Sequence, residues 1–342
     1  MMEKTLVRIL LSCVLVLILP CEIIANDGYL GVSVGGLTFQ HTDDIAMKDE
    51  DLYLSLDTVR VRYVFENVSS SDVTAAIGFP MPDLVVIPDY DDLNRHTFFG
   101  DEATDPFFFR TWVNGEEIST RATTVTARIL TPLFPSESNE KQELVDVTSR
   151  IQDFGFPLSL DSYVVGRRME ALSEEELEQL VALDLVRLSS MSIPGSDPPR
   201  PTPYPNWFLT FQFSWEQEFP AGRETVIEHQ YRPMTGGSKL WVNEPTKSEF
   251  CIDDESQAEI NRIMEERSGL HMESVPYILE TANSWAGPIG RFRLTIDRGR
   301  PDVFAFACLD IPVVEVGATT IRAEAEAFVP TQRLEVLFIV PH

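Results

Sequence analysis

The chain has 342 residues, of which 44% are hydrophobic, 24% charged and 10% aromatic. This balance is typical of a folded globular protein, so it excludes collagen, a coiled coil and a largely disordered chain. The 54 acidic residues outnumber the 27 Lys and Arg and give a net charge of -27. Because so acidic a surface repels nucleic-acid phosphates and anionic lipids, we exclude nucleic acid as a partner.

Residues 1–25 have the pattern of a secretory signal peptide. Lys4 and Arg8 give a positive start, residues 9–19 are almost uninterrupted apolar residues, and Ala25 precedes a predicted cleavage site. The apolar run is shorter than the roughly 20 residues of a transmembrane helix. We therefore expect an exported protein, periplasmic or extracellular, that meets the membrane only through this segment. An uncleaved anchor is the alternative.

Residues 26–150 predict an N-terminal β domain. Residues 58–65 alternate apolar and polar side chains, the period of a half-buried strand, and a polar turn joins them to a second such run at 73–79. This pair predicts an antiparallel hairpin. A later strand ends at Asn114 and Gly115, the dipeptide that favours a type I′ hairpin turn.

Residues 151–203 predict a helical segment followed by a proline-rich connector. A first helix is expected within 158–172. Ser173 and Glu176 then form a capping box, which predicts the start of a second helix. Residues 194–203 hold too many prolines for a helix or a central strand, so they predict a semi-rigid connector.

Residues 204–342 predict a C-terminal β-rich domain with one helix. Residues 207–215 and 225–231 predict two strands that pair across the turn between them, and residues 254–267 predict a helix that ends at Gly269. Further strands are expected at 276–282, 292–297, 303–308, 320–328 and 334–340. The fold class is mainly β with inserted helices (α+β), in antiparallel, β-sandwich-like layers.

Of the four cysteines, Cys13 and Cys21 fall in the predicted signal peptide, which leaves Cys251 and Cys308. An even pair in an exported chain predicts one disulfide. Two free thiols in separate strands are the alternative. A metal site is a weaker option, because the sequence around neither cysteine has the ligand spacing of one.

Six stretches together resemble one known family. They are FSWEQEFPAG (213–222), VIEHQYRP (226–233), WAGPIGRFRLTID (285–297), GGLTF (35–39), VRVRYVFEN (59–67) and FPMPD (79–83). The set resembles a bacterial exported family described only as a domain of unknown function, number forty-four twenty-four, and the positions of Cys251 and Cys308 fit it too. The resemblance spans nearly the whole mature chain. It implies a periplasmic or surface-exposed bacterial protein and implies no reaction.

The first candidate site is an aromatic and polar binding surface on the predicted strands around residue 220. Its residues are Trp215, Glu216, His229 and Tyr231, with Trp285 from the later glycine-rich turn. An exposed tryptophan beside a carboxylate is suited to holding a sugar or a peptide. The alternative is that Trp215 and Tyr231 point into the core, with Glu216 and His229 as a hydrogen-bonded pair.

Two further patterns have mainly structural interpretations. The run from Trp285 to Gly290 has two glycines and a proline, which predict a rigid turn before the next strand. Acidic residues gather at Asp83, Asp89, Asp91 and Asp92, and again at Asp43, Asp44, Asp49, Glu50 and Asp51. They lack the spacing of a calcium loop, so they predict solvated acidic segments and no metal site.

Catalytic and cofactor signatures are absent from the sequence: there is no G-x-S-x-G elbow, H-E-x-x-H, phosphate loop or dinucleotide fingerprint. We therefore predict no cofactor and a non-enzymatic module that binds a protein or an envelope polymer, or supports envelope structure. A secreted hydrolase that cleaves a glycan or peptide with carboxylates such as Glu216 is the alternative. A weakly calcium-stabilised adhesin-like domain is a third possibility.

Overall fold

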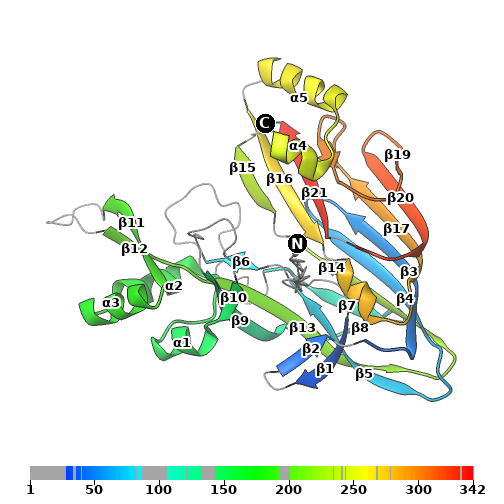
Figure 1. Ribbon diagram of the computed structural model, residues 1–342, viewed down its shortest axis with the longest axis horizontal. Coiled ribbons are helices and arrows are strands. Elements are labelled where there is room, and N and C mark those ends of the chain that lie inside the picture. The colour runs from blue at the N-terminus through cyan, green and yellow to red at the C-terminus, as the bar shows by residue number, and fades with distance from the viewer. Residues whose placement is uncertain are drawn as a thin grey trace, which may run out of the picture.

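Figure 1 presents the computed structural model of the chain. The residues it describes are 28–33, 36–39, 41–81, 83–86, 106–120, 122–131, 143–192, 201–233, 235–239, 242, 244–266, 269–277, 279–331 and 333–341. The predicted signal peptide lies outside these ranges, as do residues 194–200 of the predicted connector and Asp89, Asp91 and Asp92. None of the helices in the described part of the chain is both long enough and apolar enough to cross a membrane.

Eight strands form the larger of two main sheets, sheet I. In spatial order they are β19 (Val313–Glu315), β20 (Thr320–Phe328), β17 (Ile289–Asp297), β3 (Ile45–Leu54), β4 (Val59–Asn67), β14 (Glu224–Tyr231), β7 (Arg110–Val113) and β8 (Glu116–Ile118). Every neighbouring pair is antiparallel except β17 with β3. The β7–β8 hairpin turns at Asn114 and Gly115, both at positive φ, which confirms the predicted turn.

Sheet II has seven strands, all antiparallel to their neighbours. The order is β10 (Glu143–Asp146), β9 (Ala122–Thr131), β13 (Phe208–Phe219), β5 (Val73–Pro80), β1 (Gly28–Ser33) and β2 (Gly36–Phe39), and β6 (Leu84–Val85) also pairs with β13. Aromatic rings of the two sheets meet in the core, where Phe65 of β4 lies 5.9 Å from Phe219 of β13 and Phe109, directly before β7, stacks on Phe213 at 4.2 Å. The predicted mainly-β, sandwich-like class is confirmed.

Two predicted hairpins are wrong. The strand at 58–65 lies in sheet I as β4 and the run at 73–79 lies in sheet II as β5; likewise β13 is in sheet II and β14 is in sheet I. Both connections are therefore arches that cross from one sheet to the other. An alternating pattern identifies a strand and its buried face, but an arch and a hairpin can join the same two patterns, so the pattern does not name the partner.

A buried asparagine joins the two arches. Asn67 has no exposed surface, and its side-chain amide donates to the carbonyl oxygens of Ser71 (2.9 Å) and Phe219 (2.7 Å). Its backbone accepts from Gly222 and donates to the carbonyl of Arg223. One side chain thus ties the β4–β5 connection to the β13–β14 connection.

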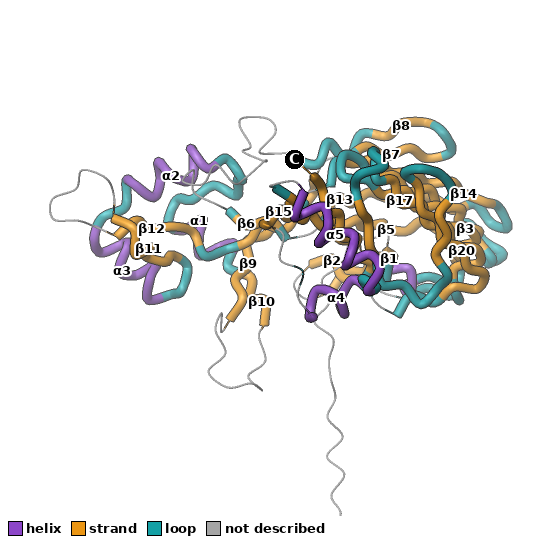
Figure 2. The backbone as a smooth tube through the Cα atoms, turned by 90° about the horizontal axis from the view of Figure 1, so that it is seen from above, coloured by secondary structure: helices purple, strands orange, loops and turns teal. Residues whose placement is uncertain are grey.

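A lobe leaves the sandwich between β10 and β13, and Figures 1 and 2 both place it to one side of the sheets. It contains α1 (Thr148–Asp153), α2 (Ser162–Glu170), α3 (Glu174–Ala182), β11 (Val186–Ser192) and β12 (Pro201–Pro205). The capping box of Ser173 and Glu176 is present at the start of α3, as predicted. The end of the predicted connector forms β12, which pairs with β11 in a two-stranded ribbon.

A third sheet, sheet III, carries the remaining helices. Its order is β15 (Gly236–Lys239), β16 (Leu270–Tyr277), β21 (Leu334–Pro341) and β18 (Phe304–Phe306), and α4 (Glu244–Phe250) and α5 (Asp254–Glu266) precede β16. Cys251, directly after α4, is joined to Cys308 by a disulfide. The predicted strand at 276–282 is wrong: β16 ends at Tyr277, and a 3₁₀ helix (Glu280–Ser284) follows it.

The sheets cross the boundaries of the two predicted β domains. β5 of the first pairs with β13 of the second, and β4 pairs with β14 in the same way. β3 also pairs with β17, more than 200 residues later in the sequence. Residues 26–150 and 204–342 therefore build both main sheets together, and only the lobe stands apart from them.

Candidate functional site

Three residues of the predicted binding surface lie in the core. His229, Tyr231 and Trp285 are 1%, 4% and 1% exposed. The His229 ring packs 5.0 Å from the Phe109 ring, and its Nδ1 lies 3.0 Å from the hydroxyl of Thr111. These three side chains are therefore core residues and not part of an exposed surface.

The remaining two residues of that surface point to opposite sides of β13. Trp215 is half-buried, with its ring 5.4 Å from that of His229, whereas Glu216 is exposed. Adjacent residues of a strand face opposite sides of its sheet, so a strand cannot present both at one point. The predicted pairing of Glu216 with His229 is not formed either, since β14 belongs to the other sheet.

The glycine-rich turn at 285–290 has the structural role that its sequence predicts. The Trp285 ring lies 4.6 Å from the Phe65 ring, and Gly287 has a φ of +71°. A methyl group on Gly290 would lie 2.6 Å from the carbonyl oxygen of Lys48, where β3 has a bulge. Glycine is needed there so that β17 can approach β3.

In β3, strand alternation places neighbouring acidic residues on opposite faces of sheet I. Glu50 points into the core with no exposed surface, whereas Asp49 and Asp51 point to the outer face of sheet I and bind arginines. Asp83, of the other acidic group, pairs with Arg128. Within the described ranges, no three His, Cys, Asp or Glu side chains converge as a metal site would require.

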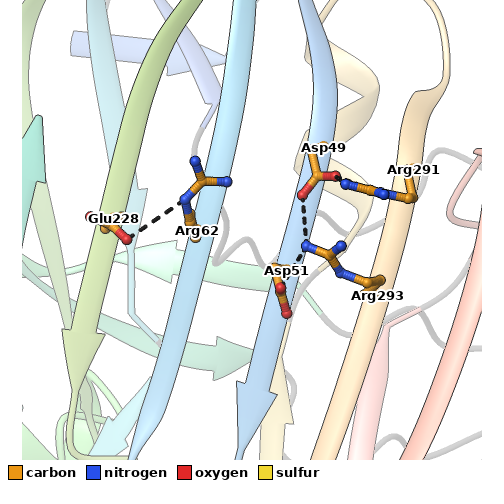
Figure 3. Close-up of polar contacts among 6 residues, drawn as sticks. All are labelled: Asp49, Asp51, Arg62, Glu228, Arg291 and Arg293. Carbon is orange, nitrogen blue, oxygen red and sulfur yellow. Dashed lines mark hydrogen bonds and ion pairs between the residues drawn. The ribbon is translucent and has the colours of Figure 1, made fainter. Parts of the chain in front are cut away.

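The outer face of sheet I carries a row of charged side chains that face one another across the strands (Figure 3). Asp49 is 2.6 Å from Arg291 and 3.2 Å from Arg293, and Arg293 is also 2.6 Å from Asp51. In the strand register, Asp51 lies opposite Arg62, and Arg62 opposite Glu228. The Arg62–Glu228 pair is looser, with 3.8 Å between Nε and Oε1.

A depression of about 500 Å³ lies on this face, over β3, β4, β14 and β7. Its lining includes Asp51, Tyr53, Arg60, Arg62, Trp112, Glu228, Gln230 and Thr295. Apart from the charged row, it contains two aromatic rings, Tyr53 and Trp112, and a further arginine, Arg60. We call this site the sheet-face depression.

Both aromatic rings are held in place by neighbours. The Arg60 guanidinium lies 4.4 Å from the centre of the Tyr53 ring, and the Tyr53 hydroxyl donates to Asp297 over 2.9 Å. Burial, and then that hydrogen bond, raise the pKa of Tyr53, whereas a bond from the Gly299 amide lowers the pKa of Asp297. The phenol therefore stays protonated and the carboxylate ionised at neutral pH.

The Trp112 ring is held on one side by Arg110, whose guanidinium lies 4.9 Å from the ring centre. Arg110 donates to both carboxylate oxygens of Glu117 on the next strand, at 2.8 and 2.7 Å. These hydrogen bonds lower the pKa of Glu117, so this support persists at neutral pH. The depression is thus preorganised, because its rings are fixed before any ligand enters.

Sequence reasoning overlooked this site, although a signal for it was present. Arginines or acids at positions two apart on one strand share a face. Such same-sign pairs occur at Asp49 and Asp51, at Arg60 and Arg62, and at Arg291 and Arg293. What the sequence could not supply is the strand order that brings these pairs side by side.

A comparison with curated proteins finds no match. Among solved structures, the chain is similar to the crystal structure of a "putative nutrient binding protein" from Legionella pneumophila. The two are 13% identical with a TM-score of 0.39, over 87% of this chain and 68% of that chain. This similarity is too weak to indicate a function. A family model matches residues 25–337, nearly the whole chain, and the protein therefore belongs to the family described as Domain of unknown function (DUF4424).

Proposed function

We propose that this protein is an exported, non-enzymatic binding module of the bacterial cell envelope, and that its ligand binds in the sheet-face depression. One observation carries the proposal: an open hollow of about 500 Å³ in which two arginines and two braced aromatic rings face solvent. Ligand sites of small molecules commonly have volumes of about 300–1,000 Å³ and a few fixed polar groups.

Two features support export. The first 25 residues have the charge and apolar pattern of a signal peptide. The disulfide between Cys251 and Cys308 suits an oxidising compartment such as the periplasm. N-terminal sequencing of the protein from a periplasmic extract should therefore begin at Asn26, and an N-terminus at Met1 would favour the uncleaved anchor.

The carboxylates of the depression do not support the alternative that the protein is a hydrolase. A glycosidase needs one carboxyl group that carries a proton beside one that is ionised. Both carboxylates of the depression lie beside guanidinium groups, Asp51 with Arg293 and Glu228 with Arg62. Both carboxylates thus belong to the charged row of sheet I, a structural role that the hydrolase alternative does not explain.

The test is a thermal melt of the mature chain, residues 26–342, against a ligand panel. The panel holds Ca²⁺ and other divalent ions, peptidoglycan fragments, oligosaccharides and short peptides. A ligand at 100 times its Kd adds about 2.7 kcal/mol of stability, so the melting temperature should rise with concentration. We expect Trp112→Ala to abolish the rise, because the substitution removes the larger ring of the depression.

The control is Tyr163→Ala, which removes an aromatic side chain that is 59% exposed on α2, in the lobe. This variant should respond to the ligand as the unmodified protein does. The proposal fails if no ligand shifts the melt, or if Trp112→Ala keeps the full shift. A rise with Ca²⁺ alone that persists in Trp112→Ala would favour the calcium-stabilised domain instead.

A further inference from the structure

Resting on the proposed function, we infer that the sheet-face depression recognises an acidic saccharide. Arg60, with Arg62 beside it, would bind the carboxylate of the sugar, and Trp112 would contact the sugar ring. The inference adds a ligand class to the site, and it depends on charge, ring geometry and the position of the site on the sheet.

Arg60 is an uncompensated cation. Its guanidinium stacks on the Tyr53 ring, and within the described part of the chain no carboxylate lies within ion-pair distance of it. Arg291 and Arg293 on the same sheet face each hold an aspartate at 2.6 Å. An unpaired guanidinium in a hollow of a chain with a net charge of -27 is a local site for an anion.

Arg62 supplies a second set of donors. It lies two residues from Arg60 on β4, so both side chains share the outer face. Its pairing with Glu228 is long, at 3.8 Å, and both side chains are about 40% exposed. An exposed pair of this length contributes little stability, so Arg62 can turn to a ligand at small cost. The planar fork of arginine matches a carboxylate in a bidentate arrangement.

The rings and neutral polar groups of the depression suit a sugar. A sugar ring has an apolar face that packs on an aromatic ring, while its hydroxyl groups both donate and accept hydrogen bonds. Trp112 supplies the ring, and Gln230 and Thr295 supply neutral donors and acceptors in the same lining. The volume of about 500 Å³ is in the range of a small oligosaccharide and not of a single carboxylate.

The position of the depression argues against an extended peptide. Peptides that bind β-sheets usually add a strand at an edge, where backbone donors and acceptors are unpaired. The depression lies over β3, β4 and β14, each of which has a strand on both sides. Their backbone groups are used in the sheet, so recognition has to come from side chains, as it does for a saccharide.

Titration calorimetry on the mature chain tests the inference. The acidic probes are trigalacturonate and a muramyl disaccharide, the neutral probe is maltotriose, and triglutamate and inorganic phosphate are the non-sugar anions. We expect an acidic sugar to bind at least roughly tenfold more tightly than maltotriose, and phosphate and triglutamate not to compete. Arg60→Gln should weaken acidic-sugar binding roughly 10- to 100-fold, the value of a charged hydrogen bond.

The matched control is Arg150→Gln, the same change of charge at an exposed arginine of α1 in the lobe, which should bind as the unmodified protein does. Equal binding of maltotriose, or unchanged binding by Arg60→Gln, overturns acidic-sugar recognition. If maltotriose binds as tightly as the acidic sugars and Trp112→Ala abolishes its binding, the depression is still a ligand site, and the proposed function stands although the acidic-sugar inference fails. The inference is also overturned if triglutamate or phosphate binds as tightly as the acidic sugars and with the same dependence on Arg60, because the site would then recognise an anion and not a sugar.

Discussion

Tyr231 is a buried phenol whose ionisation is coupled to folding. It is 4% exposed, and burial raises its pKa above the ordinary value of 10. Tyr277 is fully buried beside Glu50, and burial, followed by neighbouring negative charge, raises its pKa as well. Above pH 10 the unfolded chain releases these protons and the folded chain retains them. Stability is therefore complete below pH 10 and falls as the pH rises beyond it.

We predict that Tyr231→Phe weakens this alkaline destabilisation. The Tyr231 side chain contacts other rings and makes no hydrogen bond within the described residues, so phenylalanine should keep the packing. Each such tyrosine contributes a slope of about 1.4 kcal/mol per pH unit, which the variant should lose above pH 10. Urea unfolding from pH 8 to 12 measures it. Tyr163→Phe, at an exposed site, is the control, and an unchanged slope in Tyr231→Phe would contradict the assignment.

Residue-level sequence reasoning identified strands better than it identified which of their side chains are exposed. His229 and Tyr231 were predicted to belong to a binding surface, but they alternate with Ile227 on one face of their strand, and the structure buries all three. Arg60 and Arg62 lie on the polar face of β4, as the period predicts. Their role in a site could not be predicted, because it depends on Tyr53, Trp112 and Glu228 from three other strands.

At the scale of elements, the hydrogen bonds of Asn67 link the two arches. The Asn67→Asp variant keeps the side-chain oxygen that accepts from Ser69 but loses the amide that donates to two carbonyl groups. The buried carbonyl oxygen of Phe219 would lose this donor at a cost of about 1–3 kcal/mol, whereas that of Ser71 would still accept from the Ser69 hydroxyl. The new carboxylate would in addition be buried facing both carbonyl oxygens. We therefore expect the free energy of unfolding to fall by about 3 kcal/mol or more.

Chemical denaturation of Asn67→Asp beside Ser71→Ala measures this effect. The second variant changes an exposed side chain in the same arch and keeps the carbonyl that Asn67 binds. It should unfold within about 0.5 kcal/mol of the unmodified protein. A loss in Asn67→Asp no larger than in Ser71→Ala would show that the arches do not depend on the amide.

The elements themselves were predictable where local signals were strong. The capping box fixed the start of α3, and alternation located β20 and β21 to within a residue. The partners of the strands were not predictable, because both arches carry the same alternation that a hairpin would carry. Pairing is a non-local property, and its nearest signal, the buried Asn67, is a single residue at the end of β4.

At the scale of the whole molecule, the disulfide connects the helices beside sheet III to the segment after β18. It closes 57 residues, which in the chain-entropy model stabilises the fold by about 4 kcal/mol. We predict that a reductant lowers the melting temperature of the mature chain. The variant with both Cys251→Ser and Cys308→Ser should melt lower from the start and ignore the reductant. Non-reducing peptide mapping that finds both thiols free would contradict this.

The charged row of sheet I has a consequence for how the chain selects its strand order. Along one row of register partners the outward side chains alternate in sign from strand to strand: Glu324 on β20, Arg293 on β17, Asp51 on β3, Arg62 on β4 and Glu228 on β14. The apolar faces of these strands are alike, so burial alone does not distinguish one neighbour from another. Placing β3 against β14 or β20 would oppose acid with acid, and placing β17 against β4 would oppose arginine with arginine. Charge repulsion therefore acts against wrong topologies during folding, and the residues that frame the depression also select the arrangement in which it exists.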